Sequence, residues 1–168
     1  GNLKPFLQLG CQCVGVDIDV AQLDKAKQYL SDYSHEEKLT LIARDIYTVT
    51  PDEIGTFDII MLRDVIEHIP NQERFMHYLK DFMHGESIVF FGFPVWCHPF
   101  GGHQQICRNK LLAHMPWLHL FPNALYKKVL HWGKEKSGTI KGLLEIKATG
   151  ISLHRFEKIL FKEQYQVL

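Results

Sequence analysis

Four short apolar segments constrain the fold of this chain more than any other feature of its sequence. They lie at residues 13–17, 39–43, 57–62 and 87–93. None of them alternates strictly between apolar and polar side chains, which is typical of strands buried on both faces of a parallel sheet. Helical spacing of apolar residues, or a helix-start signal, marks the stretches between them, at 20–30, 50–55 and 71–85. The order predicts a strand–helix repeat.

This repeat predicts an α/β fold: a doubly wound, mostly parallel, Rossmann-like sheet. Parallel strands need crossover helices, which cover both faces and are almost always right-handed. A helix over 3–9 precedes the first strand, a last helix follows the N-cap Ser152, and 165–168 is expected to begin another strand. A length of 168 residues fits a single domain over 1–168.

Residues 94–150 differ from the rest, because they are basic, aromatic and interrupted by prolines. Eight Lys and Arg against two Glu give this segment a net charge of +6, whereas the whole chain balances at 19 of each sign. We interpret it as a helical insertion after the fourth strand. The overall balance gives no argument for a nucleic-acid partner.

The four cysteines do not require an oxidising compartment, since an α/β domain of this size holds its core without disulfides. No stretch approaches the length of a membrane-spanning helix, and the N-terminal sequence lacks the apolar region of a signal peptide. We therefore expect a cytoplasmic location.

Charged residues stand at the carboxyl ends of three predicted strands. Asp17 ends the first strand, Asp45 follows the second and Arg63 follows the third. Open parallel sheets bind ligands beyond this edge. The Asp17 carboxylate can accept hydrogen bonds from both hydroxyls of a ribose, and Asp45 from an adenine amino group. Alternatively, both aspartates only begin the next helix or turn.

Taken in order, three segments resemble the class I S-adenosylmethionine-dependent methyltransferases. They are Val-Gly-Val-Asp-Ile-Asp at 14–19, Ala-Arg-Asp at 43–45, and 57–70, which ends in Asp-Val-Ile-Glu-His-Ile-Pro. The resemblance covers about 1–93 and implies S-adenosylmethionine as cofactor. It also implies a ribose site at Asp17, a methionine site beside Arg63, and an adenine site near Ile18, Asp45 and Ile46.

The sequence differs from the family pattern at the glycine-rich loop. In the family this loop joins an earlier strand to the first helix and lets the backbone approach the cofactor closely. Gly1 looks like the last glycine of such a loop, so we count it as cofactor-binding. We expect the chain to begin inside the motif, without its first strand.

The loop after the fourth strand, 93–105, should overhang the cofactor. Its glycines allow a tight turn, while Trp96, His103 and Gln104 could line a pocket for the methyl acceptor. His103 is the candidate general base, because imidazole titrates near neutral pH. In the alternative interpretation the loop only closes the pocket and His103 makes local hydrogen bonds.

Metal binding is not expected from the sequence. The loop carries zinc-type ligands at Cys97, His98, His103 and Cys107, yet their spacing matches no familiar zinc motif. We also expect His68 to have a structural role in its Glu-His-Ile-Pro turn.

The predicted function is methyl transfer from S-adenosylmethionine to an oxygen or nitrogen of a small-molecule or glycan-type acceptor. Two alternatives stay open: an NAD(P)-dependent oxidoreductase, whose cofactor ribose the same Asp17 could hold, and a non-catalytic methyltransferase-like binding module.

The basic residues of 108–147 are interpreted as a lid whose charge suits an acidic or phosphorylated acceptor. A homodimer contact is one alternative. Another is an anionic membrane surface contacted through Trp117, Phe121 and Trp132.

Overall fold

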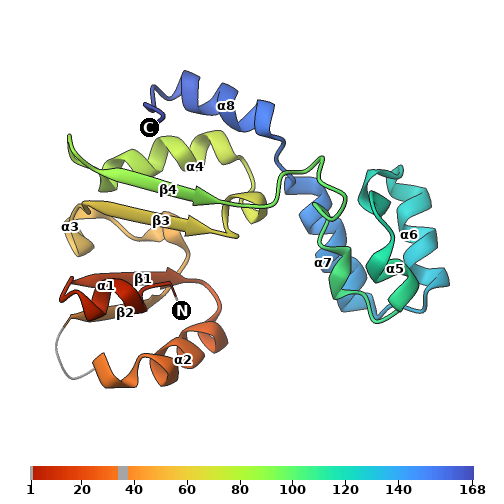
Figure 1. Ribbon diagram of the computed structural model, residues 1–168, viewed down its shortest axis with the longest axis horizontal. Coiled ribbons are helices and arrows are strands. Elements are labelled where there is room, and N and C mark those ends of the chain that lie inside the picture. Colours follow the sequence, from red (N-terminus) through yellow and green to blue (C-terminus); the bar gives the residue numbers. More distant parts are fainter. Residues whose placement is uncertain (1, 34–37) are drawn as a thin grey trace. The chain divides into compact units, whose positions relative to one another are not determined.

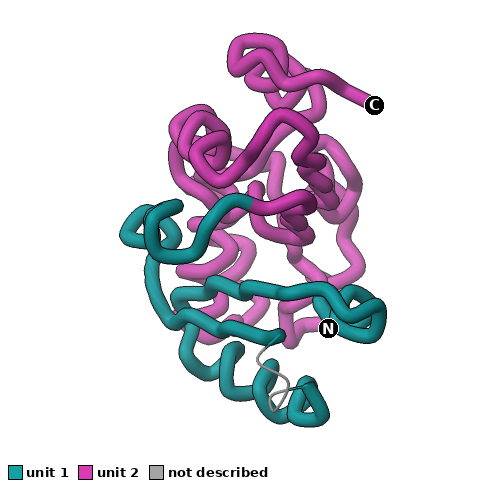
Figure 2. The backbone as a smooth tube through the Cα atoms, turned by 90° about the vertical axis from the view of Figure 1, so that its left-hand side faces the viewer, with its two compact units in different colours: residues 1–56 teal, residues 57–168 magenta. Residues whose placement is uncertain are grey.

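The structure, a computed structural model, describes residues 2–33 and 38–168. Its chain divides into two compact units, residues 1–56 and residues 57–168 (Figure 2). Each unit contains one pair of parallel strands: β1 with β2 in the first unit, and β3 with β4 in the second. These pairs confirm the α/β class and the parallel strands. A single doubly wound sheet stays a prediction, because the described strands form two separate two-stranded ladders.

The first unit begins with α1 and alternates strands with helical turns. Its elements are α1 (Lys4–Gln8), β1 (Cys13–Asp17), α2 (Val20–Tyr29), η1 (Ser31–Tyr33), β2 (Leu39–Ala43), η2 (Ile46–Thr48) and α3 (Pro51–Ile54). Side-chain caps set the helix starts: Asp19 accepts from the amide of Ala21 at 2.9 Å, and Thr50 forms a capping box with Glu53. A small core of Leu7, Cys13 and Leu30 lies beneath the ladder.

The second unit contains the other ladder, with helices α4 and α8 beside it, and the helices of residues 94–150. Its α/β elements are β3 (Ile59–Arg63), η3 (Ile66–His68), α4 (Gln72–Leu79), η4 (Lys80–Phe82), β4 (Ile88–Gly92) and α8 (Leu153–Lys162). Asn71 caps α4 and Ser152 caps α8, as the sequence predicts. Helix α8 packs beside α4 (Figure 1), and its Phe156 ring contacts the ring of Phe91 on β4 at 5.0 Å.

The prediction of a strand at 165–168 is wrong. These residues follow α8 as irregular chain, and Gln164 takes a left-handed conformation with φ of 58° that turns the backbone away from the helix. The Tyr165 hydroxyl then donates to the carbonyl of Met76 at 2.7 Å. The tyrosine therefore anchors the chain to α4 and is not part of a ladder.

Helices occupy most of the segment predicted to be an insertion. They are η5 (Gln104–Ile106), α5 (Lys110–His114), η6 (Leu118–Leu120), α6 (Asn123–Trp132) and α7 (Ser137–Thr149), which Figure 1 shows grouped together. They have a hydrophobic core of their own, formed by Cys107, Leu112, Leu118, Tyr126, Leu130, Ile140 and Leu143. The buried Glu135 carboxylate accepts from the amides of Arg108 and Asn109 at 3.1 and 2.8 Å, which fixes the start of α5.

None of the helices in the described part of the chain is both long and apolar enough to cross a membrane.

Candidate functional site

Four of the predicted cofactor residues lie together at one edge of the first unit. Asp17 is the last residue of β1 and pairs with Ala43, the last residue of β2. The Arg44 amide continues the ladder by donating to the Asp17 carbonyl at 3.1 Å. Because the strands are parallel, Asp17 and Ile18 leave the ladder at the same edge as Asp45 and Ile46.

Both aspartates also form local turns. The Oδ1 atom of Asp17 accepts from the Asp19 amide at 2.8 Å, and the Oδ1 atom of Asp45 accepts from the Tyr47 amide at 3.0 Å. These bonds match the alternative in which the aspartates begin the next element. The two roles are compatible, since a carboxylate has about four acceptor positions and both side chains are exposed.

This edge fits a nucleoside. Ile18 follows Asp17 directly, and its side chain is 72% exposed. An apolar surface beside a carboxylate can contact the face of a base while the acid binds ribose hydroxyls. Gly1, the remaining predicted contact of this unit, lies outside the described residues.

Arg63 occupies the corresponding edge of the second unit. It is the last residue of β3 and pairs with Gly92 of β4. Its guanidinium is exposed and lies 3.8 Å from the Asp64 carboxylate. The charge is therefore accessible for a carboxylate ligand, as the methionine site requires.

Trp96 lies among residues of the helical insertion. Its ring packs edge-on against His119 at 4.4 Å, and a Cβ atom placed on Gly150 would lie 2.1 Å from that ring. The Trp96 carbonyl lies 2.7 Å from Nε2 of His119, close enough to accept its hydrogen. These contacts join the loop to α7, and the role of Trp96 in an acceptor pocket stays a prediction.

Gln104 is fully buried. Its amide nitrogen donates to the carbonyls of Pro99 and Met115 at 2.7 and 3.0 Å, so it ties the loop to the start of the insertion. Both hydrogen bonds of the Gln104 amide nitrogen are thus made within the protein. Binding of the acceptor by Gln104 also stays a prediction.

His103 faces a buried carboxylate. Its Nε2 atom lies 3.8 Å from Oε1 of Glu67, and its ring meets the ring of His68 edge-on with centroids 5.3 Å apart. Glu67 is 1% exposed, and neither of its side-chain oxygens has a hydrogen-bond partner among the described residues. The His103 Nε2 atom is likewise buried and unpartnered.

Burial controls the protonation of this group. It raises the pKa of Glu67, against smaller lowering effects of the Glu67 backbone and of His103. It lowers the pKa of His68 and the pKa of His103, and the neighbouring His68 lowers the pKa of His103 further. Burial therefore favours the neutral form of both imidazoles.

The cysteines predicted as unlikely metal ligands do not join this group. In the described ranges, Glu67, His68 and His103 are the residues whose ligand atoms converge, all within 4.8 Å of one another. Cys107 lies in the core of the insertion, where burial raises the pKa of its thiol to about 11, and Cys97 is exposed. The sequence alone did not reveal Glu67, because 34 intervening positions separate His68 from His103 and no local pattern signals the contact.

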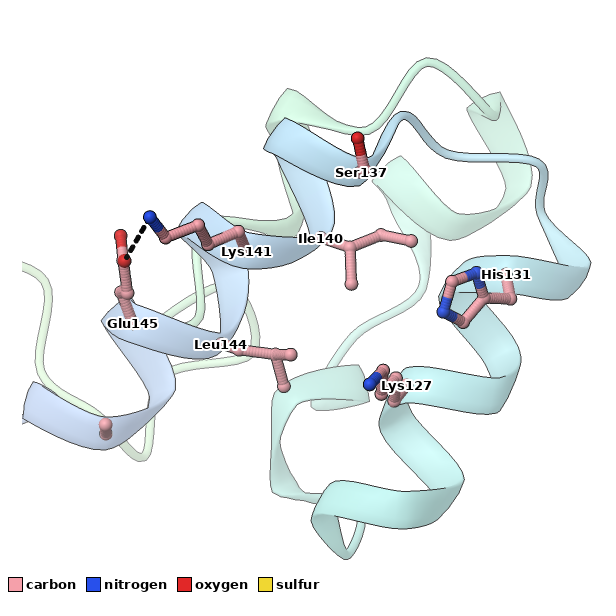
Figure 3. Close-up of a pocket in the computed structure, with 8 residues that line it drawn as sticks. Lys127, His131, Ser137, Ile140, Lys141, Leu144 and Glu145 are labelled. Atoms are coloured by element: carbon pink, nitrogen blue, oxygen red, sulfur yellow. Dashed lines mark ion pairs between the residues drawn. The ribbon is translucent and has the colours of Figure 1, made fainter.

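A groove of about 550 Å³ lies between α6 and α7 within the insertion (Figure 3). Ile140 and Leu144 form its apolar side, while Lys127 and His131 face it from α6 and Lys141 pairs with Glu145 at 3.8 Å. No predicted cofactor or acceptor residue lines this groove.

Comparison with known proteins identifies the family of the chain. A family profile described as a methyltransferase domain matches residues 1–86, which include Asp17, Asp45 and Arg63. No curated protein and no solved structure matches the chain. The match covers more than half of the 168 residues. The chain therefore belongs to the methyltransferase-domain family of S-adenosylmethionine-dependent enzymes.

Proposed function

We propose that this methyltransferase uses the edge formed by Asp17, Ile18, Asp45 and Ile46 to hold the nucleoside of S-adenosylmethionine. The observation that carries the proposal is the Asp17 carboxylate at the end of β1, with the 72% exposed Ile18 beside it. Asp17 would accept from the ribose hydroxyls and Asp45 from the adenine amino group. Ile18 and Ile46 would contact the base, and Arg63 would bind the methionine carboxylate.

When bound, this cofactor supplies an electrophilic methyl group on a sulfonium. The protein residues contribute alignment of the acceptor and exclusion of water, which account for most of the catalysis in such transfers. The role of His103 as general base stays a prediction. Its neutral imidazole could accept a proton, but Nε2 faces Glu67 and would have to turn toward the acceptor.

For the acceptor we propose an oxygen or nitrogen of a small molecule or glycan that carries an acidic or phosphate group. The +6 charge of residues 94–150 supports an anionic acceptor. Lys127 and Lys141, which contribute to this charge, line the groove of Figure 3. Trp117, Phe121 and Trp132 are all exposed. Their side chains are therefore accessible to a second copy of the chain or to a membrane surface, as the two alternative interpretations require.

Ligand-induced stabilisation tests the cofactor assignment. S-adenosylmethionine and S-adenosylhomocysteine should each raise the melting temperature of the chain, because a ligand stabilises the folded state that it binds. NAD should leave it unchanged. Stabilisation by NAD and not by the adenosyl ligands would instead support the oxidoreductase interpretation. Transfer of a labelled methyl group to pooled phosphorylated and unphosphorylated sugars would then test the acceptor class.

A further inference from the structure

We propose that Glu67, His68 and His103 form a binding site for a divalent transition-metal ion such as Zn²⁺. Their candidate donor atoms all lie within 4.8 Å of one another. In a tetrahedral site with bonds of about 2.0–2.2 Å the donor atoms are about 3.3–3.6 Å apart, so the side chains need to close by up to about 1.5 Å. Rotation of two imidazole rings supplies a movement of that size.

The burial of unsatisfied polar atoms is the second observation. Both Glu67 oxygens and the His103 Nε2 atom are buried without a hydrogen-bond partner in the described structure. Proteins rarely leave such groups unsatisfied, because an uncompensated buried carboxylate is strongly destabilising. At 3.8 and 3.9 Å, the contacts of Glu67 with His103 and His68 are too long for hydrogen bonds. A cation between the three donors would satisfy all of them.

The backbone places these donors by unusual conformations. Asp64 has φ of 54° directly after β3, and its amide donates to the Gly92 carbonyl at 2.7 Å. The chain then turns into η3, which the fully buried Ile66 anchors and against which α7 packs. His103 also has a positive φ, of 55°. Left-handed backbone at non-glycine residues costs free energy and is concentrated at functional sites.

The donor set selects the class of metal. Two imidazoles and one carboxylate suit zinc and similar first-row ions better than Mg²⁺ or Ca²⁺, which prefer oxygen ligands. Three protein ligands leave a fourth position open, as in catalytic zinc sites. As a ligand, His103 would have a role different from the general base that the sequence predicts.

Zinc titration of the untagged full chain, stripped of metal by a chelator, tests the proposal. Calorimetry should show one Zn²⁺ per chain. Loss of an outer-shell partner typically weakens metal binding 10- to 100-fold, so removal of a ligand by Glu67→Gln or His103→Gln should weaken it at least about 100-fold. Cys97→Ser and His98→Gln are matched controls from the same loop and should keep the wild-type affinity. Co²⁺ in place of zinc should give the visible absorption of a nitrogen- and oxygen-ligated site.

Heat stability separates a metal ligand from a structural residue. Zinc should raise the melting temperature of the wild type and leave that of Glu67→Gln nearly unchanged, because a ligand stabilises only the folded state that it binds. A residue with a purely structural role would change the melting temperature without metal and keep the zinc-induced rise. Absence of zinc binding, equal zinc affinity of wild type and Glu67→Gln, or an equal zinc-induced rise in both would each overturn the proposal. These measurements need no cofactor, so their outcome is independent of the proposed S-adenosylmethionine site.

Discussion

Substitution of Asp17 by alanine tests the cofactor edge most directly. The change removes the carboxylate that ends β1 and leaves the β1–β2 ladder intact, because the ladder uses only backbone groups of this residue. One local bond is lost, the 2.8 Å hydrogen bond from the Asp19 amide. At an exposed position its loss costs about 0.5–1 kcal/mol of folding free energy.

The expected effect on cofactor binding follows from the hydrogen bonds that Asp17 would make. A hydrogen bond to a charged group contributes about 1.5–3 kcal/mol, and the exposure of this side chain places each ribose bond at or below the lower limit. Two weak bonds together account for about 1.5–3 kcal/mol. Since 1.4 kcal/mol is a tenfold change in affinity, Asp17→Ala should raise the Kd for S-adenosylhomocysteine by roughly 10- to 150-fold.

Calorimetry of three variants measures this effect and separates it from damage to the turn. Asp17→Asn keeps an oxygen acceptor for the Asp19 amide but loses the charge, so its Kd should lie between those of wild type and Asp17→Ala. Asp24→Ala removes an equally exposed acid on α2, whose 3.6 Å pair with Lys27 is a weak surface contact, and it should bind like the wild type. A Kd for folded Asp17→Ala within twofold of the wild-type value would refute the ribose assignment.

Three further predictions concern the second unit and the four cysteines of the chain. Glu135→Ala leaves two amides at the start of α5 without their acceptor, so urea unfolding should show a loss of about 2–4 kcal/mol, and a loss below about 1 kcal/mol would contradict this role. Under native conditions a thiol reagent should modify the exposed Cys11 and Cys97 within minutes. It should spare the buried Cys13 and Cys107 until the chain unfolds, and peptide mass spectrometry can measure the difference. Burial lowers the pKa of His119 in the folded state. Below the ordinary histidine pKa of about 6.5, the unfolded state therefore binds more protons than the folded state. The free energy of unfolding should then fall by up to about 1.4 kcal/mol for each pH unit of acidification. His119→Gln should show a shallower slope between pH 7 and 5, and an unchanged slope would rule out this contribution.

Much of the fold could be predicted because its signals are local. Residues 39–43 form β2 as expected, and β3 begins at Ile59, two residues later than predicted. The helix N-caps Thr50, Asn71 and Ser152 could also be predicted, because a cap side chain accepts a hydrogen bond from an amide only three or four residues away in sequence. The conformation of residues 165–168 could not be predicted, because Tyr165 packs on α4 through a hydrogen bond to Met76, which is distant in sequence.

The candidate site likewise contains residues that the sequence predicts and residues that it does not. Asp17 and Asp45 could be placed at one edge from the sequence, because parallel strands carry their carboxyl ends to the same side. Glu67 could not be recognised as part of a site. Its neighbours in sequence show an ordinary turn, and its burial depends on the packing of α7, whose residues lie some 70 positions further along the chain.

The burial of Glu67 is the observation that the fold alone does not explain. An ionised carboxylate without partners costs several kcal/mol in a protein interior, a large share of the 5–15 kcal/mol that stabilise a typical domain. Protonation lowers this cost, and the raised pKa of Glu67 is in that direction, but a neutral carboxyl still needs partners for its hydrogen and its carbonyl oxygen. Both histidines stand about 1 Å too far away to be those partners. A metal ion of about 2 Å bond length fits the space that these separations leave, and it compensates the negative charge, which a hydrogen bond from a neutral imidazole would not.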